Sequence, residues 1–240
     1  MKKVLAAVVA FLIPCAAWTA SVQFDISKGA NKDVIYEKGV QPKASPLGQN
    51  PVGTQSLVED AYSSGTNVAV GLPTDRKIQS TSASLGTYIL LPYNQKNVIE
   101  FSTATNAVPV SYTIHVPTKR YDAIGLLVLA VDGDASFTLK LEYDDGTTDE
   151  NWFEADDWYD LGPRGNLRKV VRNMDRVEAS SGKVEKSGHF NLYEFIFDSL
   201  RGLNTEKKLT AITISNDPNR WPDSANRWGC VFAVNGSSIE

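Results

Sequence analysis

The sequence predicts an all-β fold, an antiparallel β-sandwich of two sheets. Apolar or alternating segments rich in β-branched and aromatic residues recur along the chain. Turn-forming pairs such as Asp132-Gly133 and Asp145-Gly146 separate these segments. Convincing helical periodicity is rare. Together these observations indicate some ten strands in one large β domain.

The amino terminus predicts an export signal ahead of the first strand. Lys2 and Lys3 precede an apolar stretch over residues 4–13, which is shorter than the ~20 residues of a membrane-spanning helix. Ala20, or alternatively Ala17, offers the small residue that precedes a cleavage site. We therefore expect a signal peptide over residues 1–20 and a single domain over 21–240, secreted or periplasmic.

The charge balance argues against nucleic-acid binding. The chain has 24 Lys and Arg against 28 Asp and Glu, and loss of Lys2 and Lys3 with the signal makes the formal net charge about −6. No later apolar run reaches membrane length, so we expect no transmembrane segment. Pro14 stands where a lipoprotein signal has a small residue, and we do not expect lipid anchoring at Cys15. Cys230 is then the one remaining cysteine and has no disulfide partner.

The expected strands follow from short β-type patterns bounded by turn residues. The stretch from Gly125 to Val131 is almost continuously apolar and predicts a central strand, whereas Phe137, Leu139 and Leu141 alternate with polar residues and predict one buried face. The ten expected strands are Val22–Ile26, Thr87–Leu91, Val98–Ser102, Val110–Val116, Ala123–Val131, Ser136–Tyr143, Thr147–Phe153, Phe190–Asp198, Leu209–Ser215 and Cys230–Val234.

Two segments depart from this pattern. Residues 38–64 are rich in Pro, Gly, Ser and Gln and predict a long surface loop. Residues 163–188 carry a local basic excess and predict an insertion. Within it, apolar residues between Leu167 and Val177 fall at helical spacing, which favours one short amphipathic helix; the alternative is an excursion without regular structure.

Several phrases resemble the galactose-binding-like (discoidin-type) jelly-roll domains attached to secreted bacterial carbohydrate-active enzymes. They include FDISKGANKD, LLPYNQKNVIEF, RYDAIGLLVLAVDGDASFTLKLEYDDGTTDE, DWYD and KKLTAITISND. The resemblance spans most of the mature chain. It implies a two-sheet antiparallel jelly roll with ligand loops at one end and, often, a structural Ca²⁺. We expect this domain to stand without an attached catalytic domain, and it carries the basic segment. A shared fold does not fix a function.

The run LEYDDGTTDENWFEADDWYDLG, residues 141–162, holds nine carboxylates in its first twenty residues. The simplest interpretation is a solvated hairpin, because Asp145-Gly146 suits a tight turn. Paired catalytic acids and an acidic partner face are alternatives. A calcium site is the main rival, because hard cations take six to eight oxygen ligands. The candidate ligands are Asp156, Asp157 and Asp160, with Asp25 as a separate candidate from the resemblance.

A second constellation lies near the carboxyl terminus, where Asn-Arg-Trp occurs twice, seven residues apart. Sugar recognition needs a flat aromatic face together with donors and acceptors for hydroxyl groups, and this segment has each type. The candidate ligand-binding residues are Arg220, Trp221, Asp223, Asn226, Arg227 and Trp228. The simpler alternative is that one tryptophan caps the sandwich while the arginines pair with surface acids.

The sequence therefore predicts a secreted, non-catalytic carbohydrate-binding module that recognises a glycan through loops at one end of a β-sandwich. No catalytic residue is assigned, and a structural Ca²⁺ is the only cofactor considered. One alternative is a structural or protein-interaction module of the envelope or extracellular matrix. Another is a polysaccharide-degrading lyase or glycosidase. A glycan screen separates the first interpretation from the other two.

Overall fold

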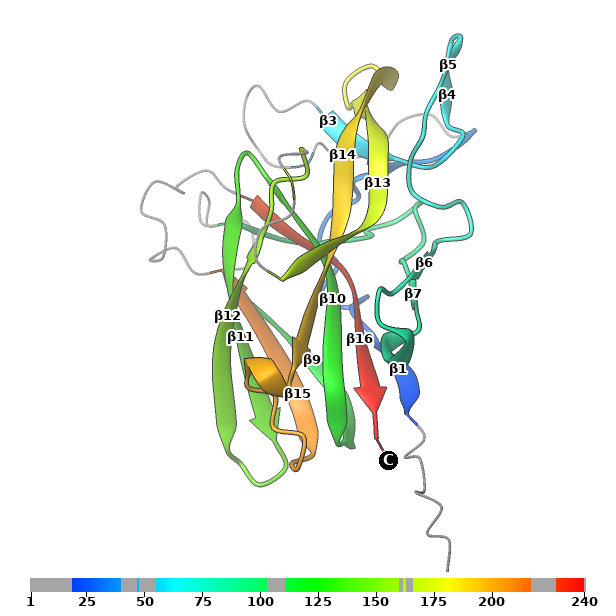
Figure 1. The fold of residues 1–240 in the computed structure, drawn as a ribbon. Coiled ribbons are helices and arrows are strands. Elements are labelled where there is room, and N and C mark those ends of the chain that lie inside the picture. Colours follow the sequence, from blue (N-terminus) through cyan, green and yellow to red (C-terminus); the bar gives the residue numbers. More distant parts are fainter. Residues whose placement is uncertain are drawn as a thin grey trace, which may run out of the picture.

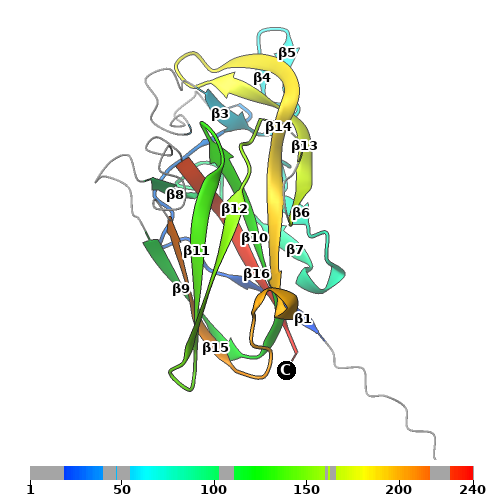
Figure 2. The same cartoon turned by 60° about the vertical axis from the view of Figure 1, so that its left-hand side comes forward.

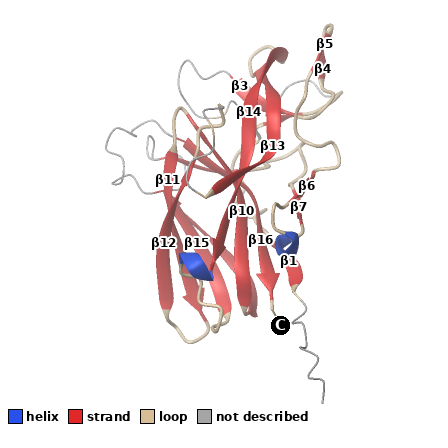
Figure 3. Cartoon of the chain, viewed as in Figure 1, coloured by secondary structure: helices blue, strands red, loops and turns tan. Residues whose placement is uncertain are grey.

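The structure is a computed structural model that describes residues 19–39, 47, 55–102, 111–159, 162, 166–216 and 228–239. Strands dominate this part of the chain, and two short 3₁₀ turns are the helical elements drawn in Figure 3. No helix within the described ranges has the length and apolarity to cross a membrane. The predicted signal peptide lies almost wholly outside these ranges and stays a prediction.

The larger sheet has eight strands, with the order β1-β16-β10-β14-β13-β3-β2, and β8 pairs with β16 beside this path. Figure 1 shows its long strands β16, β10, β14 and β13. All its pairings are antiparallel except that of β2 with β3. Its strands are β1 (Ala20–Phe24), β2 (Ile35–Tyr36), β3 (Gln55–Val58), β8 (Ile99–Ser102), β10 (Tyr121–Val131), β13 (Leu167–Glu178), β14 (Lys183–Asp198) and β16 (Trp228–Ser238).

The smaller sheet is antiparallel and has the order β12-β11-β15-β9. Figure 2 shows it in front of the larger sheet, so that the two form the layers of a sandwich. Its strands are β9 (Ser111–Lys119), β11 (Ala135–Tyr143), β12 (Thr148–Ala155) and β15 (Leu209–Asn216). The expected all-β antiparallel sandwich is confirmed.

Two small hairpins and two 3₁₀ turns complete the described elements. The hairpins are β4 (Ser63–Ser64) with β5 (Asn67–Val68) and β6 (Lys77–Gln79) with β7 (Thr87–Ile89). The turn η1 (Ala83–Leu85) joins β6 to β7, and η2 (Ser199–Arg201) directly follows β14.

The core lies between the two sheets, where apolar faces meet. The interior strand β10 is buried along almost its whole length, as its continuous apolarity predicts. In β11 the side chains of Phe137, Leu139 and Leu141 are buried while the intervening ones are partly exposed, which confirms the predicted alternation. A Cβ at Gly229 of β16 would lie 2.0 Å from the Cζ of Phe137, so a glycine is needed where this ring crosses between the sheets.

The prediction of a short helix within residues 163–188 is wrong, because this segment forms β13, a turn and the start of β14. Register shifts interrupt the pairing of β13 with β14 at three places between Lys169 and Arg176. The first two shifts each add one residue to β13, and the third leaves extra residues on β14. These irregularities break the alternation of buried and exposed side chains. The buried residues Leu167, Met174 and Val177 therefore fall at intervals that imitate a helix. The basic segment is part of the main sheet.

The long loop expected over residues 38–64 contains two strands among its described residues, β3 and β4. Residues 40–46 and 48–54 lie outside the described ranges. The sequence QSLV of β3 is short, yet Ser56, Leu57 and Val58 are all buried. It lies between β2, its parallel partner, and β13, its antiparallel partner. Long-range pairing stabilises this strand where local composition indicates a loop.

Candidate functional site

The first half of the acidic run forms the predicted hairpin. The turn between β11 and β12 is closed by hydrogen bonds from the Tyr143 N–H to the Thr147 carbonyl and from the Gly146 N–H to the Tyr143 carbonyl, both 3.0 Å. Gly146 has a φ of 80°, a conformation that glycine adopts without strain. The Asp145 carboxylate accepts a hydrogen bond from the Thr147 N–H at 3.0 Å. Turn geometry therefore accounts for this Asp-Gly pair.

Hydrogen bonds join the second half of the acidic run to the turn between β10 and β11. The Asp157 carboxylate accepts hydrogen bonds from the N–H groups of Gly133 (2.6 Å) and Tyr159 (2.8 Å). In return, the Asp157 N–H donates to the Asp134 carboxylate at 3.0 Å. Trp158 is buried, with its ring centroid 4.3 Å from that of Phe190. Asp157 therefore fixes the course of the chain after β12.

The candidate calcium ligands are not brought into one cluster within the described ranges. Asp25 is exposed beside β1 and accepts a hydrogen bond from the Ser27 N–H at 2.8 Å; the hydrogen bonds from Ser27 lower its pKa. Asp156 is buried next to Asp157, and Asp160 lies outside the described residues. No group of three or more His, Cys, Asp or Glu side chains within these ranges could hold a metal ion. Calcium binding stays a prediction, which a melting curve with and without EDTA would test.

Of the predicted ligand-binding residues, the structure describes only Trp228. The other five lie outside the described ranges: Arg220, Trp221, Asp223, Asn226 and Arg227. Trp228 opens β16 with only 1% of its surface exposed, and the Lys32 ammonium lies 5.6 Å from the centroid of its ring. The ring is therefore not presented to a ligand, in agreement with a tryptophan that caps the sandwich.

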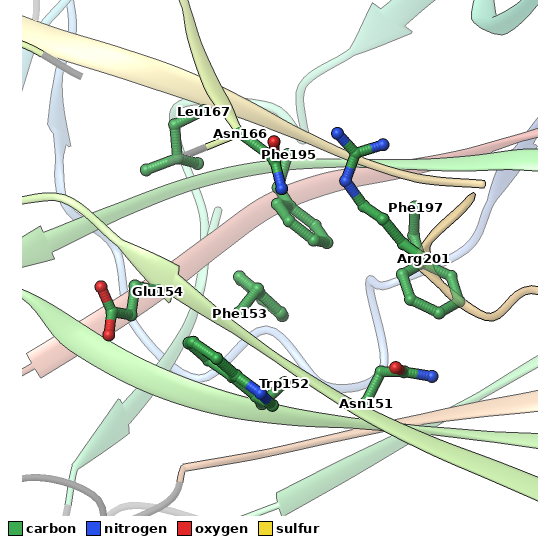
Figure 4. A pocket seen from close by; sticks show the side chains of 9 residues that line it. All are labelled: Asn151, Trp152, Phe153, Glu154, Asn166, Leu167, Phe195, Phe197 and Arg201. Carbon is green, nitrogen blue, oxygen red and sulfur yellow. The ribbon is translucent and has the colours of Figure 1, made fainter. Parts of the chain in front are cut away.

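The structure presents a pocket of about 280 Å³ at the open edge of the sandwich, between β12 and the pair β13–β14. Figure 4 shows it from close by. The lining residues are Asn151, Trp152, Phe153, Glu154, Asn166, Leu167, Phe195, Phe197 and Arg201. We call it the Trp152 pocket. It combines an apolar floor with amide, carboxylate and guanidinium groups at its rim.

Strand alternation on β12 assigns opposite roles to neighbouring residues. Phe153 points inward and is buried, and its ring stacks on that of Phe195 at 4.5 Å with an interplanar angle of 15°. Trp152 therefore points the other way and keeps 50% of its surface exposed. β12 is the edge strand of its sheet. The large apolar surface of Trp152 is thus held on a rigid strand at the rim of the pocket.

Arg201 enters the pocket from η2, on the far side from β12. Its Nη1 lies 2.9 Å from the Asp198 Oδ2, an ion pair that holds the guanidinium in place. The loop then passes close to β12 at Gly202, where a Cβ would lie 2.9 Å from the Asn151 Nδ2. In Figure 4, Arg201 and Asn166 lie on one side of the pocket and Trp152 on the other, with the phenylalanine rings between them.

This arrangement suits recognition of a polyhydroxyl ligand. An exposed tryptophan offers a flat apolar face for the C–H side of a sugar ring. The side chains of Asn151, Asn166, Glu154 and Arg201 offer both hydrogen-bond donors and acceptors for hydroxyl groups. Glu154 is the only acid among the residues that line the pocket.

This pocket was not predicted from the sequence. Asn151, Trp152 and Glu154 lie within the acidic run, and strand alternation puts Trp152 on the same face as Thr148 and Glu150. A tryptophan at a solvent-facing strand position was the available signal. Asn166 and Arg201 come from separate segments, and only the pairing of distant strands brings them to the same pocket.

Comparisons with known proteins add little to this description. No protein-family model matches the chain, and no curated protein matches it. Among solved structures, the chain is similar to one titled "Apo Crh5 transglycosylase", with 13% sequence identity over 84% of this chain and 92% of that chain. The TM-score is 0.28. With a similarity this low, the function has to be inferred from the residues of the site.

Proposed function

We propose that the protein is a non-catalytic glycan-binding module that holds a sugar in the Trp152 pocket. The observation that carries the proposal is the half-exposed indole of Trp152 at the rim of a pocket lined by amide, carboxylate and guanidinium groups. A pyranose buries its C–H face against such a ring and directs its hydroxyl groups toward the polar rim. The edge strand β12 and the core beneath it hold the side chains that line the pocket. Little conformational entropy is therefore lost when a ligand binds.

The composition of the pocket supports binding over hydrolysis. Most glycosidases use two carboxylic acids about 5–9.5 Å apart, one of them with a raised pKa. Here Glu154 is the only acid among the lining residues, and the neighbouring Asp198 is paired with Arg201. Glu154 is suited to accept hydrogen bonds from sugar hydroxyl groups.

The remaining sequence predictions form part of the same proposal. Export through a signal peptide over residues 1–20 would bring the protein to extracellular or envelope polysaccharide. A galactose-binding-like jelly roll with an optional structural Ca²⁺ is compatible with the sandwich. The segment from Arg220 to Arg227 would add a second set of contacts.

Screening the mature protein against an array of plant, fungal and bacterial glycans tests the proposal. The expected result is binding to at least one glycan class that is lost in Trp152→Ala. Binding to no glycan by a folded wild-type protein would contradict it and would favour a protein-interaction module.

A further inference from the structure

A second pocket, of about 250 Å³, lies where the segment after β12 meets β14. Its lining residues are Leu47, Gln55, Val131, Asp132, Asp157, Trp158, Tyr159, Arg176 and Phe190. We call it the Tyr159 pocket. Like the Trp152 pocket it has aromatic walls and polar groups, and Tyr159 at its rim is 46% exposed.

Strand pairing places the two pockets at different positions along β14. Leu167 of β13 is paired with Phe195 of β14, and both line the Trp152 pocket. Phe190 lies five residues earlier on β14 and lines the Tyr159 pocket, where it also forms a bridge with Tyr159. Five residues of strand span about 17 Å. The two pockets are therefore separate sites at neighbouring positions along β14.

The exposed aromatic rings coincide with these two pockets. Among the described residues, the large hydrophobic side chains with high exposure include only two aromatic ones, Trp152 and Tyr159. Both follow the same stretch of chain, β12 and its continuation, seven residues apart. The Tyr159 ring is held by Phe190, with centroids 5.7 Å apart in an edge-to-face arrangement. Two fixed rings at two neighbouring pockets suit a chain of sugar units better than a single sugar.

The charges of the Tyr159 pocket disfavour an anionic chain. Asp132 and Asp157 both line it, and burial, together with the neighbouring Asp157 charge, raises the pKa of Asp132. The guanidinium of Arg176 is already paired, with its Nε 2.6 Å from the Glu185 Oε2. A uronate or sulfate group would bring another negative charge beside two carboxylates. Uncharged hydroxyl groups can donate hydrogen bonds to the same carboxylates.

We propose that the ligand is an uncharged, linear glycan chain long enough to occupy both pockets, with Trp152 and Tyr159 as its two ring platforms. This inference rests on the proposed glycan-binding function and extends it to a polymer. It implies that affinity rises with chain length until both pockets are filled, because the second contact is made by a ligand that is already bound.

The test is calorimetric titration with size-defined neutral oligosaccharides, from disaccharide upward, prepared from the polysaccharide that the glycan screen identifies. For the wild type we expect long chains to bind at least about tenfold more tightly than short ones. In Tyr159→Ala this ratio should collapse toward one, whereas Tyr159→Phe, which keeps the ring, should retain most of it. Ile89→Ala removes an exposed side chain on β7 and should bind as the wild type does.

The outcomes separate the two proposals. Short and long chains that bind equally well, with affinity still dependent on Trp152, would overturn the two-pocket inference and leave the proposed function standing. A full length dependence in Tyr159→Ala, or equal binding of polygalacturonate and neutral chains, would also overturn it. Binding to no glycan at all would overturn both. Circular dichroism of each variant verifies that the fold is intact.

Discussion

Phe153 of β12 and Phe195 of β14 stack across the sandwich with ring centroids 4.5 Å apart. The contact joins the edge strand of the smaller sheet to the middle of the larger one, and both rings line the Trp152 pocket. The same pair therefore contributes to the core and forms the floor of the proposed binding site.

Removing one ring of this pair should destabilise the protein. We expect Phe195→Ala to lower the free energy of unfolding by about 3–5 kcal/mol, because it leaves a cavity between the sheets. Urea unfolding followed by fluorescence measures the change. Leu200→Ala is the control, since Leu200 is 91% exposed and should change stability by less than ~0.5 kcal/mol. Equal stability of the two variants would contradict the stacked arrangement.

Glu194 should be essential for anchoring the β6–η1–β7 segment. Its buried carboxylate accepts hydrogen bonds from the Tyr88 hydroxyl (2.7 Å), the Thr81 N–H (2.9 Å) and the hydroxyl groups of Ser80 and Thr81. Glu194→Ala leaves several buried donors without an acceptor, at about 1–3 kcal/mol each. We expect a loss of at least about 3 kcal/mol by urea unfolding.

The matched control for Glu194 is Glu150→Ala, which removes an exposed glutamate from β12 and should be almost neutral. Glu194→Gln, which keeps one carbonyl acceptor, should fall between the two. A loss below about 1 kcal/mol in Glu194→Ala would show that the hydrogen-bonded cluster does not stabilise the fold.

Asp132→Asn should stabilise the protein at neutral pH. Burial, and next the charge of Asp157, raises the pKa of Asp132 above its ordinary value of 3.8. The folded state therefore holds this proton more tightly than the unfolded state, and the stability that protonation provides is lost as the pH rises through the folded pKa. Asparagine removes that loss and tolerates the φ of 63° found here.

The gain from Asp132→Asn should disappear below about pH 3.8, where the aspartate is protonated in both states. Thermal melting of both proteins across this pH range measures it. A variant that is less stable than the wild type at neutral pH would mean that the charged form of Asp132 has a stabilising partner.

Glu154 should contribute to binding without catalysis. We expect the wild type to release no reducing ends and no unsaturated products from mixed neutral polysaccharides, and Glu154→Gln to weaken glycan binding by a few-fold because one charged acceptor is lost. Assays of both products alongside the binding titration test this. Product formation that disappears in Glu154→Gln would identify the protein as a polysaccharide-degrading enzyme.

Strong local patterns made most of the sandwich predictable. The apolar run of β10 and the alternation of β11 can be satisfied only by an interior strand and a half-buried strand. Each of the ten expected strands overlaps a strand of the structure. Among the missed strands, β2, β4 and β5 have two residues each, β6 has three and β3 has four, too few for any period to be recognised. In β13 the bulges replaced the strand period with a helix-like one.

The candidate site was less predictable for a different physical reason. Alternation fixes the direction of Trp152 from its own strand, but the opposite wall depends on pairings between distant segments. Leu167 reaches Phe195 only through the register of β13 with β14. Arg201 and Asn151 line the same pocket because the loop after η2 passes close to β12 at Gly202. Neither relationship has a local sequence signal.

The most direct test is affinity electrophoresis of the mature wild type, Trp152→Ala and Trp221→Ala in gels that contain a soluble neutral polysaccharide from the glycan screen. We predict that the wild type is retarded and that Trp152→Ala loses at least about tenfold in affinity, or ~1.4 kcal/mol. Trp221→Ala measures any added contribution from the segment near the carboxyl terminus. A folded Trp152→Ala protein that is retarded like the wild type would contradict the assignment of the glycan site to the Trp152 pocket.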